Sequence, residues 1–159
     1  MKRLIPFLLL TCGLALTPIL TAKDAPPRFK TIEVKHFTVA EGVPISQDFV
    51  NFFYDGLRTV LPKQKLAERI VEEGAVVPEA EAADSMVVEG TFTGYNKGGF
   101  GHGIGRVNVE IRLYRRSDHS VIKTIVAQIP FKPSPFNKDK NVGEFTGGRA
   151  SFEIERALQ

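Results

Sequence analysis

Cysteine is nearly absent from this chain: its 159 residues include one, Cys12. Cys12 lies within the first 22 residues, a segment that has the pattern of an export signal. Cleavage after Ala22 would leave a mature domain, 23–159, that contains no cysteine. Disulfide bonds, thiol catalysis and cysteine-ligated metals would all be excluded from such a domain.

Long hydrophobic runs are also scarce. The apolar run 4–20 follows Lys2 and Arg3 and leads to the small residue Ala22, as in a cleavable signal peptide. A membrane anchor is the alternative, but the run is shorter than the ~20 residues that a membrane-spanning helix needs, and prolines interrupt it. We expect a signal peptide at 1–22, periplasmic localisation and a mature protein without a transmembrane helix. Lipid attachment at Cys12 is the alternative.

Neither sign of charge dominates the mature domain. The chain has 21 Lys and Arg residues against 18 Asp and Glu, and two of the basic residues leave with the signal peptide. The charges are nevertheless segregated, since 68–89 holds seven carboxylates and one cation, whereas 97–149 holds ten cations and four carboxylates. This pattern indicates an unevenly charged solvated surface, contact of the basic half with anionic lipid or glycan, or pairing between subunits. Export excludes cytosolic nucleotides and nucleic acid as expected ligands.

Hydrophobic periodicity predicts one exported α/β domain at 23–159. Alternation of apolar and polar residues predicts strands at 29–39, 75–77, 85–95, 106–115 and 121–129. A helical period predicts a long helix over 47–61, with Ser46 as its N-cap. Two further helical turns are expected at 65–73, and a short terminal helix, or alternatively a strand, at 149–158.

The expected fold class is α+β. The order of elements predicts a single mixed or antiparallel sheet of about five strands, with one long and one short helix packed on one face. The segments 96–105 and 130–141, rich in glycine and in proline respectively, are expected to be loops.

The glycine-rich segment Gly98 to Gly105 resembles a phosphate-binding loop only in composition. Such a loop connects a strand to a helix N-terminus, whereas strands are expected on both sides here, and no Gly-Lys-Ser/Thr follows. The segment is interpreted as a flexible or bulged connection, or as a loop that contacts a ligand or partner. The candidate contact residues are Tyr95, Lys97, Phe100, His102 and Arg106.

Catalytic constellations are missing from the sequence. The three histidines, His36, His102 and His119, do not have the spacing of a metal site, so no metal or cofactor is expected. Asp118-His119-Ser120 holds the residue types of a hydrolase triad, but neighbours in sequence cannot align nucleophile, base and orienting group. The chain is therefore predicted not to be an enzyme. A small hydrolase or isomerase that uses His102 is the weaker alternative.

One middle segment resembles a known family. The run Val87-Val88-Glu89-Gly90-Thr91, the glycines of 98–105, and the alternating strand from Arg106 to Arg115 are similar to a bacterial family of small exported proteins, domain of unknown function 4410. Many of its members are lipoproteins. The resemblance implies an envelope-facing α/β domain and supplies no catalytic residues.

These observations together predict a non-catalytic periplasmic binding or assembly module of the cell envelope. An envelope protein, anionic lipid or glycan is the expected partner, and the oligomeric state is left open. A soluble periplasmic inhibitor or chaperone-like partner protein is the alternative. Its distinguishing sign would be an exposed apolar patch around Phe100, Phe131 and Phe136.

Overall fold

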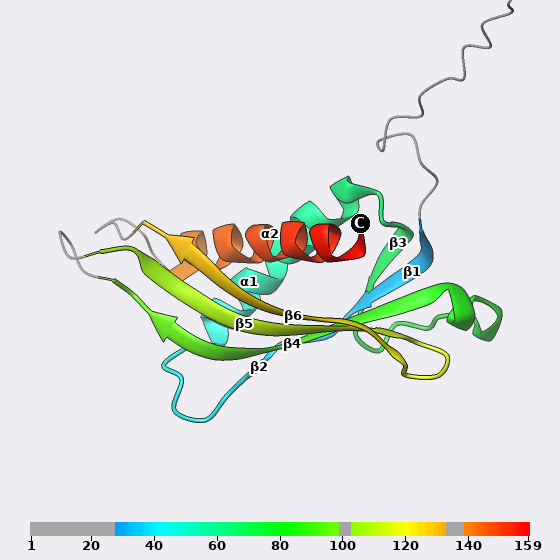
Figure 1. Cartoon of the computed structure of the whole chain (residues 1–159), viewed down its shortest axis with the longest axis horizontal. Helices are drawn as coiled ribbons and strands as arrows, with labels where there is room; N and C mark the ends of the chain where they lie inside the picture. Colours follow the sequence, from blue (N-terminus) through cyan, green and yellow to red (C-terminus); the bar gives the residue numbers. More distant parts are fainter. Residues whose placement is uncertain (1–27, 99–102, 133–138) are drawn as a thin grey trace, which may run out of the picture.

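The computed structural model describes residues 28–98, 103–132 and 139–159, which form one α+β unit. A mixed sheet makes one layer and two long helices cover one of its faces, while the other, helix-free face carries no α-helix (Figure 1). The strands are β1 (Phe29–Val34), β2 (Thr38–Val39), β3 (Ala67–Glu72), β4 (Ser85–Asn96), β5 (Gly105–Arg115) and β6 (Val121–Phe131). The helices are α1 (Gln47–Val60) and α2 (Asp139–Leu158), with short 3-10 turns η2 (Leu61–Gln64) and η3 (Glu79–Asp84). The predicted fold class is confirmed.

The sheet combines parallel and antiparallel pairing. Its strand order is β3-β1-β4-β5-β6, and the short strand β2 also pairs with β4. β1 runs parallel to both β3 and β4, whereas β4, β5 and β6 are joined as antiparallel neighbours. The predicted first strand, 29–39, is thus divided into β1 and β2, and Lys35 to Phe37 connect them.

Helix α1 forms as its sequence predicts. The Ser46 hydroxyl accepts a hydrogen bond from the Phe49 N–H at 3.2 Å, which satisfies one of the free N–H groups of the first turn. Phe49, Phe53 and Leu57 are buried on one side of the helix. Phe53 packs edge-on against Phe92 of β4, with ring centroids 4.9 Å apart, so α1 is fixed to the inner face of the sheet.

Strand β5 supplies the centre of the core. Its alternate residues Val107, Val109, Ile111 and Leu113 are fully buried beneath the helices, as their spacing predicts. The intervening side chains point to the opposite, helix-free face of the sheet.

Two predictions about residues 65–77 are wrong. Residues 65–73 are not helical, because Lys65 adopts a left-handed conformation (φ 55°) that ends η2, and the chain then pairs with β1 as β3. The predicted strand at 75–77 is absent, since Gly74 turns the chain with φ 81° and Val76 is 89% exposed. The local pattern of residues 65–77 could not reveal the strand at 67–72, because that strand forms by pairing with the edge of β1, which is distant in the sequence.

The terminal helix is longer than predicted. α2 begins at Asp139 rather than at 149 and continues through Gly147 and Gly148. The predicted loop 130–141 is correspondingly shorter, because β6 extends to Phe131, and residues 133–138 lie outside the described part of the chain. Glycine disfavours helix in isolation, but tertiary packing overrides that preference here: the two glycines are buried against α1.

Candidate functional site

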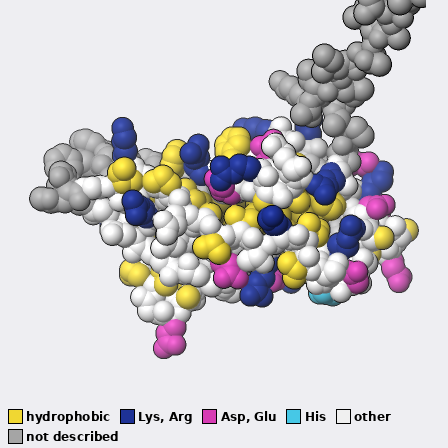
Figure 2. Space-filling model, viewed as in Figure 1, with side chains coloured by type: hydrophobic (Ala, Val, Ile, Leu, Met, Phe, Trp, Pro, Cys, Tyr) yellow, Lys and Arg dark blue, Asp and Glu magenta, His cyan; other side chains and the backbone are white. Residues whose placement is uncertain are grey.

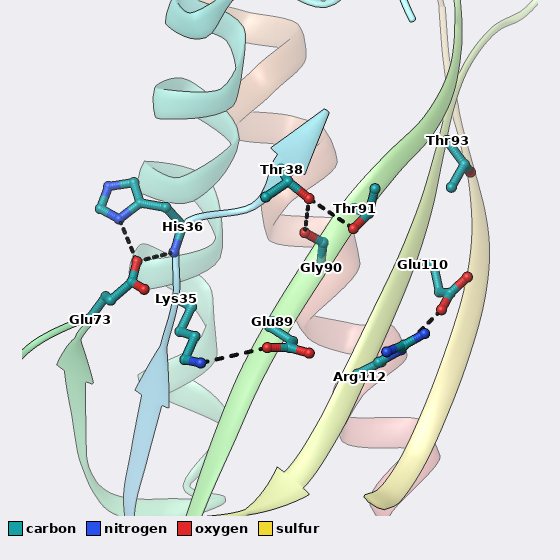
Figure 3. A pocket seen from close by; sticks show the side chains of 10 residues that line it. All are labelled: Lys35, His36, Thr38, Glu73, Glu89, Gly90, Thr91, Thr93, Glu110 and Arg112. Carbon is teal, nitrogen blue, oxygen red and sulfur yellow. Dashed lines mark hydrogen bonds and ion pairs between the residues drawn. The ribbon is translucent and has the colours of Figure 1, made fainter. Parts of the chain in front are cut away.

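A polar groove with a volume of about 460 Å³ lies on the helix-free face of the sheet (Figure 3). The residues that line it are Lys35, His36, Thr38, Glu73, Glu89, Gly90, Thr91, Thr93, Glu110 and Arg112. They come from the β1–β2 connection, from β2, from the residue that follows β3, and from the middle of β4 and β5. The groove therefore depends on segments that are far apart in the sequence.

The strand period decides which side chains enter the groove. Met86, Val88 and Phe92 of β4 face the core, so Glu89, Thr91 and the other intervening residues point outward. Glu110 and Arg112 point outward from β5 in the same way, and Glu110 pairs with Thr91 in the register of the two strands.

Opposite charges are paired along the groove. Lys35 Nζ lies 3.6 Å from Glu89 Oε2, and Arg112 Nε donates to Glu110 Oε1 at 3.2 Å. The backbone N–H of His36 donates to Glu73 at 3.1 Å, and the His36 ring nitrogen Nδ1 lies 3.3 Å from the same oxygen. The hydrogen bond from the His36 backbone is the main reason why the pKa of Glu73 is lowered.

Tyr114 lies beside the groove, and threonine hydroxyls line it. The Tyr114 hydroxyl donates to Glu89 at 3.2 Å, and the Lys35 ammonium lies 5.4 Å from the centre of the Tyr114 ring. Tyr114 beside the ammonium group raises the pKa of Lys35. The hydroxyls of Thr38 and Thr91 are 2.9 Å apart, where β2 meets β4.

The groove carries polar groups that can bind a ligand. It offers ion pairs and threonine hydroxyls as donors and acceptors, but no serine or cysteine nucleophile stands beside a base among its lining residues. Within residues 28–98, 103–132 and 139–159, no three His, Cys, Asp or Glu side chains are placed to hold a metal ion.

A second hollow, with a volume of about 600 Å³, is mainly apolar and lies on the helix side of the sheet. It is lined by Ile104, Pro130, Phe131, Lys132, Asn141, Val142 and Phe145, where β5 begins, β6 ends and α2 begins. Of the three phenylalanines expected to mark an apolar patch, Phe131 lines this hollow, and Phe100 and Phe136 lie outside the described residues.

Of the five residues predicted from the glycine-rich segment, the three that the structure describes do not share one surface. Tyr95 packs inward between Phe49 and Phe131, with ring centroids 5.3 and 6.1 Å away, and burial raises its pKa. Lys97 is exposed, 3.9 Å from Asp139 at the start of α2. Arg106 points to the opposite face of the sheet, because its neighbour Val107 pairs with Tyr95 and is buried. Phe100 and His102 lie outside the described residues.

The sequence-based interpretation missed the polar groove. The alternating polar positions of β4 and β5 were a usable signal, because they mark one polar face on each strand. Nothing in the local pattern showed that His36 and Glu73 would meet beside that face, since this contact requires the parallel pairing of β1 with β3.

The fold is shared with known bacterial proteins. PelC from Paraburkholderia phytofirmans, solved as a dodecamer, superposes with a TM-score of 0.55 at 13% identity over 85% of this chain and 94% of its own. Protein XCC0632 from Xanthomonas campestris, of the family DUF330, gives a TM-score of 0.57 at 10% identity over 82% of this chain and 85% of its own.

A homologue of a neuraminyllactose-binding hemagglutinin from Helicobacter pylori gives a TM-score of 0.52 at 6% identity over 88% of each chain. None of these three proteins is named for an enzymatic activity. No protein-family model matches this chain, and no curated protein matches it by sequence. At these identities the similarity establishes the fold.

Proposed function

We propose that this chain is a non-catalytic binding module of the bacterial cell envelope that holds a polar, hydroxyl-rich ligand, such as a glycan segment, in the groove on the helix-free face of the sheet. The observation that carries the proposal is the composition of that groove, in which paired charges alternate with the hydroxyls of Thr38, Thr91 and Thr93. Such walls offer donors and acceptors at short intervals, as the ring hydroxyls of a saccharide require.

The envelope location rests on the N-terminal segment. A signal peptide at 1–22, cleaved after Ala22, would export the domain 23–159 to the periplasm, where polysaccharides are abundant and nucleotides are not. The structural similarity to a homologue of a neuraminyllactose-binding hemagglutinin is compatible with a glycan ligand. Membership of domain of unknown function 4410 stays a prediction that agrees with an envelope role.

The balance of charge in the groove favours a neutral or weakly charged ligand. Each cation there is already paired with a carboxylate, so a strongly anionic ligand would have to compete with Glu89 for Lys35 and with Glu110 for Arg112. The sequence-based expectation of a basic, anion-attracting half therefore does not describe this groove.

The test uses the mature protein, 23–159, on an array of defined bacterial oligosaccharides, followed by calorimetric titration of any oligosaccharide retained. Thr91→Val should weaken binding by about five- to tenfold, the worth of one hydrogen bond. Thr124→Val is the matched control, because Thr124 points outward from β6 on the same sheet face but does not line the groove. Retention of no oligosaccharide, or an equal effect of the two substitutions, would contradict the proposal.

A further inference from the structure

The outward side of α2 carries exposed aromatic residues. Phe145 and Phe152 are 50% and 49% exposed, although most phenylalanines of the described chain are buried. They are seven residues apart and so lie on one side of the helix, opposite the glycines that pack on α1. Arg149 and Arg156 share that side and are exposed.

This aromatic side of α2 belongs to a wider surface. Phe145 also lines the apolar hollow, whose outer edge is formed by Ile104, 56% exposed. In Figure 2, yellow hydrophobic side chains follow the junction of α2 with β6, and dark-blue Lys and Arg side chains are scattered around them. We call this the α2 surface: the outward side of α2 together with the apolar hollow and the adjoining edge of β6.

Cations outnumber carboxylates on the α2 surface. Lys123, Lys132, Arg149 and Arg156 contribute positive charge, whereas two carboxylates, Glu153, which pairs with Arg156, and Glu155, border the outward side of α2. Lys123 lies on the helix side of β6, because it pairs with the buried Leu113. Exposed phenylalanine rings surrounded by Lys and Arg are the groups with which proteins bind the surface of an anionic bilayer.

The chain enters the domain beside this surface. The Arg28 guanidinium donates a hydrogen bond to the carbonyl of Leu158, the last residue of α2. The segment that precedes Arg28 therefore joins the domain on the helix side of the sheet.

We infer that the α2 surface docks on anionic phospholipid, with Phe145 and Phe152 entering the headgroup region and Arg149 and the neighbouring cations pairing with lipid phosphates. None of the helices in the described part is both long and apolar enough to cross a bilayer, and the inferred contact is with the surface of the bilayer. The polar groove lies on the opposite face of the sheet, so a docked domain would hold it away from the membrane. This inference stands on residues that the proposed glycan site does not use.

The experiment exploits the absence of tryptophan from the chain. Phe152→Trp places a single fluorophore on the α2 surface of the mature protein. Val76→Trp places one at an 89% exposed position in the segment that covers the other face of the sheet near Glu33. Each variant is mixed with vesicles of phosphatidylethanolamine plus phosphatidylglycerol, and with vesicles of phosphatidylcholine alone.

The Phe152→Trp emission should shift to shorter wavelength with the anionic vesicles only, and the shift should fade as salt is added. Arg149→Glu changes the local charge by two units, which at about 1 kcal/mol each should weaken vesicle binding by roughly 25-fold. Arg106→Glu is the matched control, since Arg106 is exposed on the opposite face of the sheet, and should have little effect.

Three results would overturn the inference. The first is the absence of a shift with anionic vesicles, and the second is an equal shift of the Val76→Trp variant. The third is a Phe152→Trp emission that is already at short wavelength without lipid in a protein that light scattering shows to be dimeric, because the surface would then be a subunit interface. Glycan binding should be the same in the Phe152→Trp and Arg149→Glu variants as in the wild type, because the groove lies on the opposite face of the sheet. Its measurement therefore tests the proposed function separately from the membrane contact.

Discussion

Gly147 of α2 lies directly against the backbone carbonyl of Phe53 in α1. A Cβ atom at this position would be 2.8 Å from the carbonyl carbon of Phe53 and 2.9 Å from the amide nitrogen of Leu57. Gly143, one helical turn earlier, faces the Phe49 carbonyl oxygen and the Phe53 amide nitrogen, each 3.1 Å from a Cβ placed there, and Gly56 of α1 meets the backbone of Glu144. The two helices therefore approach each other closely at these glycines, and α2 also packs on β6.

We predict that Gly147→Ala destabilises the protein. In a solvent-exposed helix this substitution would gain up to about 1 kcal/mol, but here the methyl group must separate two backbones, which costs about 1–3 kcal/mol. The urea midpoint of the mature protein should fall accordingly. Gly148→Ala is the control, because its Cβ would lie 3.1 Å from the Val60 side chain and at an ordinary contact distance, 3.9 Å, from the Gly56 carbonyl oxygen, so its effect should be smaller. A higher urea midpoint for Gly147→Ala than for the wild type would contradict the packing described.

A second prediction concerns an ion pair on the helix-free face, in which the carboxylate is buried and the cation is partly exposed. Glu33 of β1 is 6% exposed, accepts a hydrogen bond from Arg116, and lies 3.4 Å from the Gly74 N–H. Arg116→Met should lower the free energy of unfolding by about 2 kcal/mol, because it leaves a carboxylate buried without its cation.

The neighbouring residue provides the control for that substitution. The Arg115 side chain is exposed and its hydrogen bond to the Ala83 carbonyl is long, 3.4 Å, so Arg115→Met should change stability by no more than about 0.5 kcal/mol. The double substitution Glu33→Gln with Arg116→Met should recover part of the loss, since it removes the unpaired charge. Equal effects of the two single substitutions in urea unfolding would show that the pair is not specifically stabilising.

A third prediction tests the cap of α1. Ser46→Ala removes the acceptor for the Phe49 N–H and should cost about 1 kcal/mol of stability. Ser46→Asp keeps an acceptor and adds a negative charge at the helix N-terminus, so it should retain wild-type stability. Denaturant unfolding followed by circular dichroism measures both variants, and loss of stability in Ser46→Asp would argue against the cap.

A fourth prediction concerns pH and the edge of the groove. The pKa of Glu73 is lowered in the folded state by the hydrogen bond from the His36 backbone. A carboxyl group with a depressed folded-state pKa adds stability above its unfolded pKa, about 4.3, and this contribution disappears as the pH falls through the lower folded value. The stability difference between wild type and Glu73→Gln should therefore be largest near neutral pH and vanish in acid.

Urea unfolding at a series of pH values measures that difference. Glu79→Gln is a suitable control, because Glu79 is exposed at the start of η3 and does not line the groove. A difference between wild type and Glu73→Gln that grows as the pH falls would contradict a lowered pKa of Glu73 in the folded state.

Much of the fold follows from local pattern, because periodicity and capping act over a few neighbouring residues. The α1 stripe of Phe49, Phe53 and Leu57 and the alternation of β5 each bury one side of a regular element, and both appear in the structure where they were predicted. These patterns are readable because burial of one face imposes a period of 3.6 or 2 on the sequence. The α+β class follows from their order along the chain.

The candidate site could be predicted far less well. Tyr95 and Arg106 are close in sequence but point to opposite faces, since they occupy positions of opposite parity in the β4–β5 register. His36 and Glu73 are 37 residues apart and meet because β1 and β3 pair in parallel. A side-chain cluster of this kind depends on strand order, which local composition does not encode.

The sequence by itself determined that residues 23–159, which contain no cysteine, are stabilised by apolar packing and not by disulfide bonds. It also determined the capped helix and the long alternating strands, because these features depend on residue type and spacing alone. The tertiary structure decided that 67–72 is a strand, that Gly147 lies inside a helix, and which polar side chains share a groove. The physical reason is the same in each case: an open strand edge or a facing helix supplies contacts that outweigh local preference, and those partners are distant in the chain.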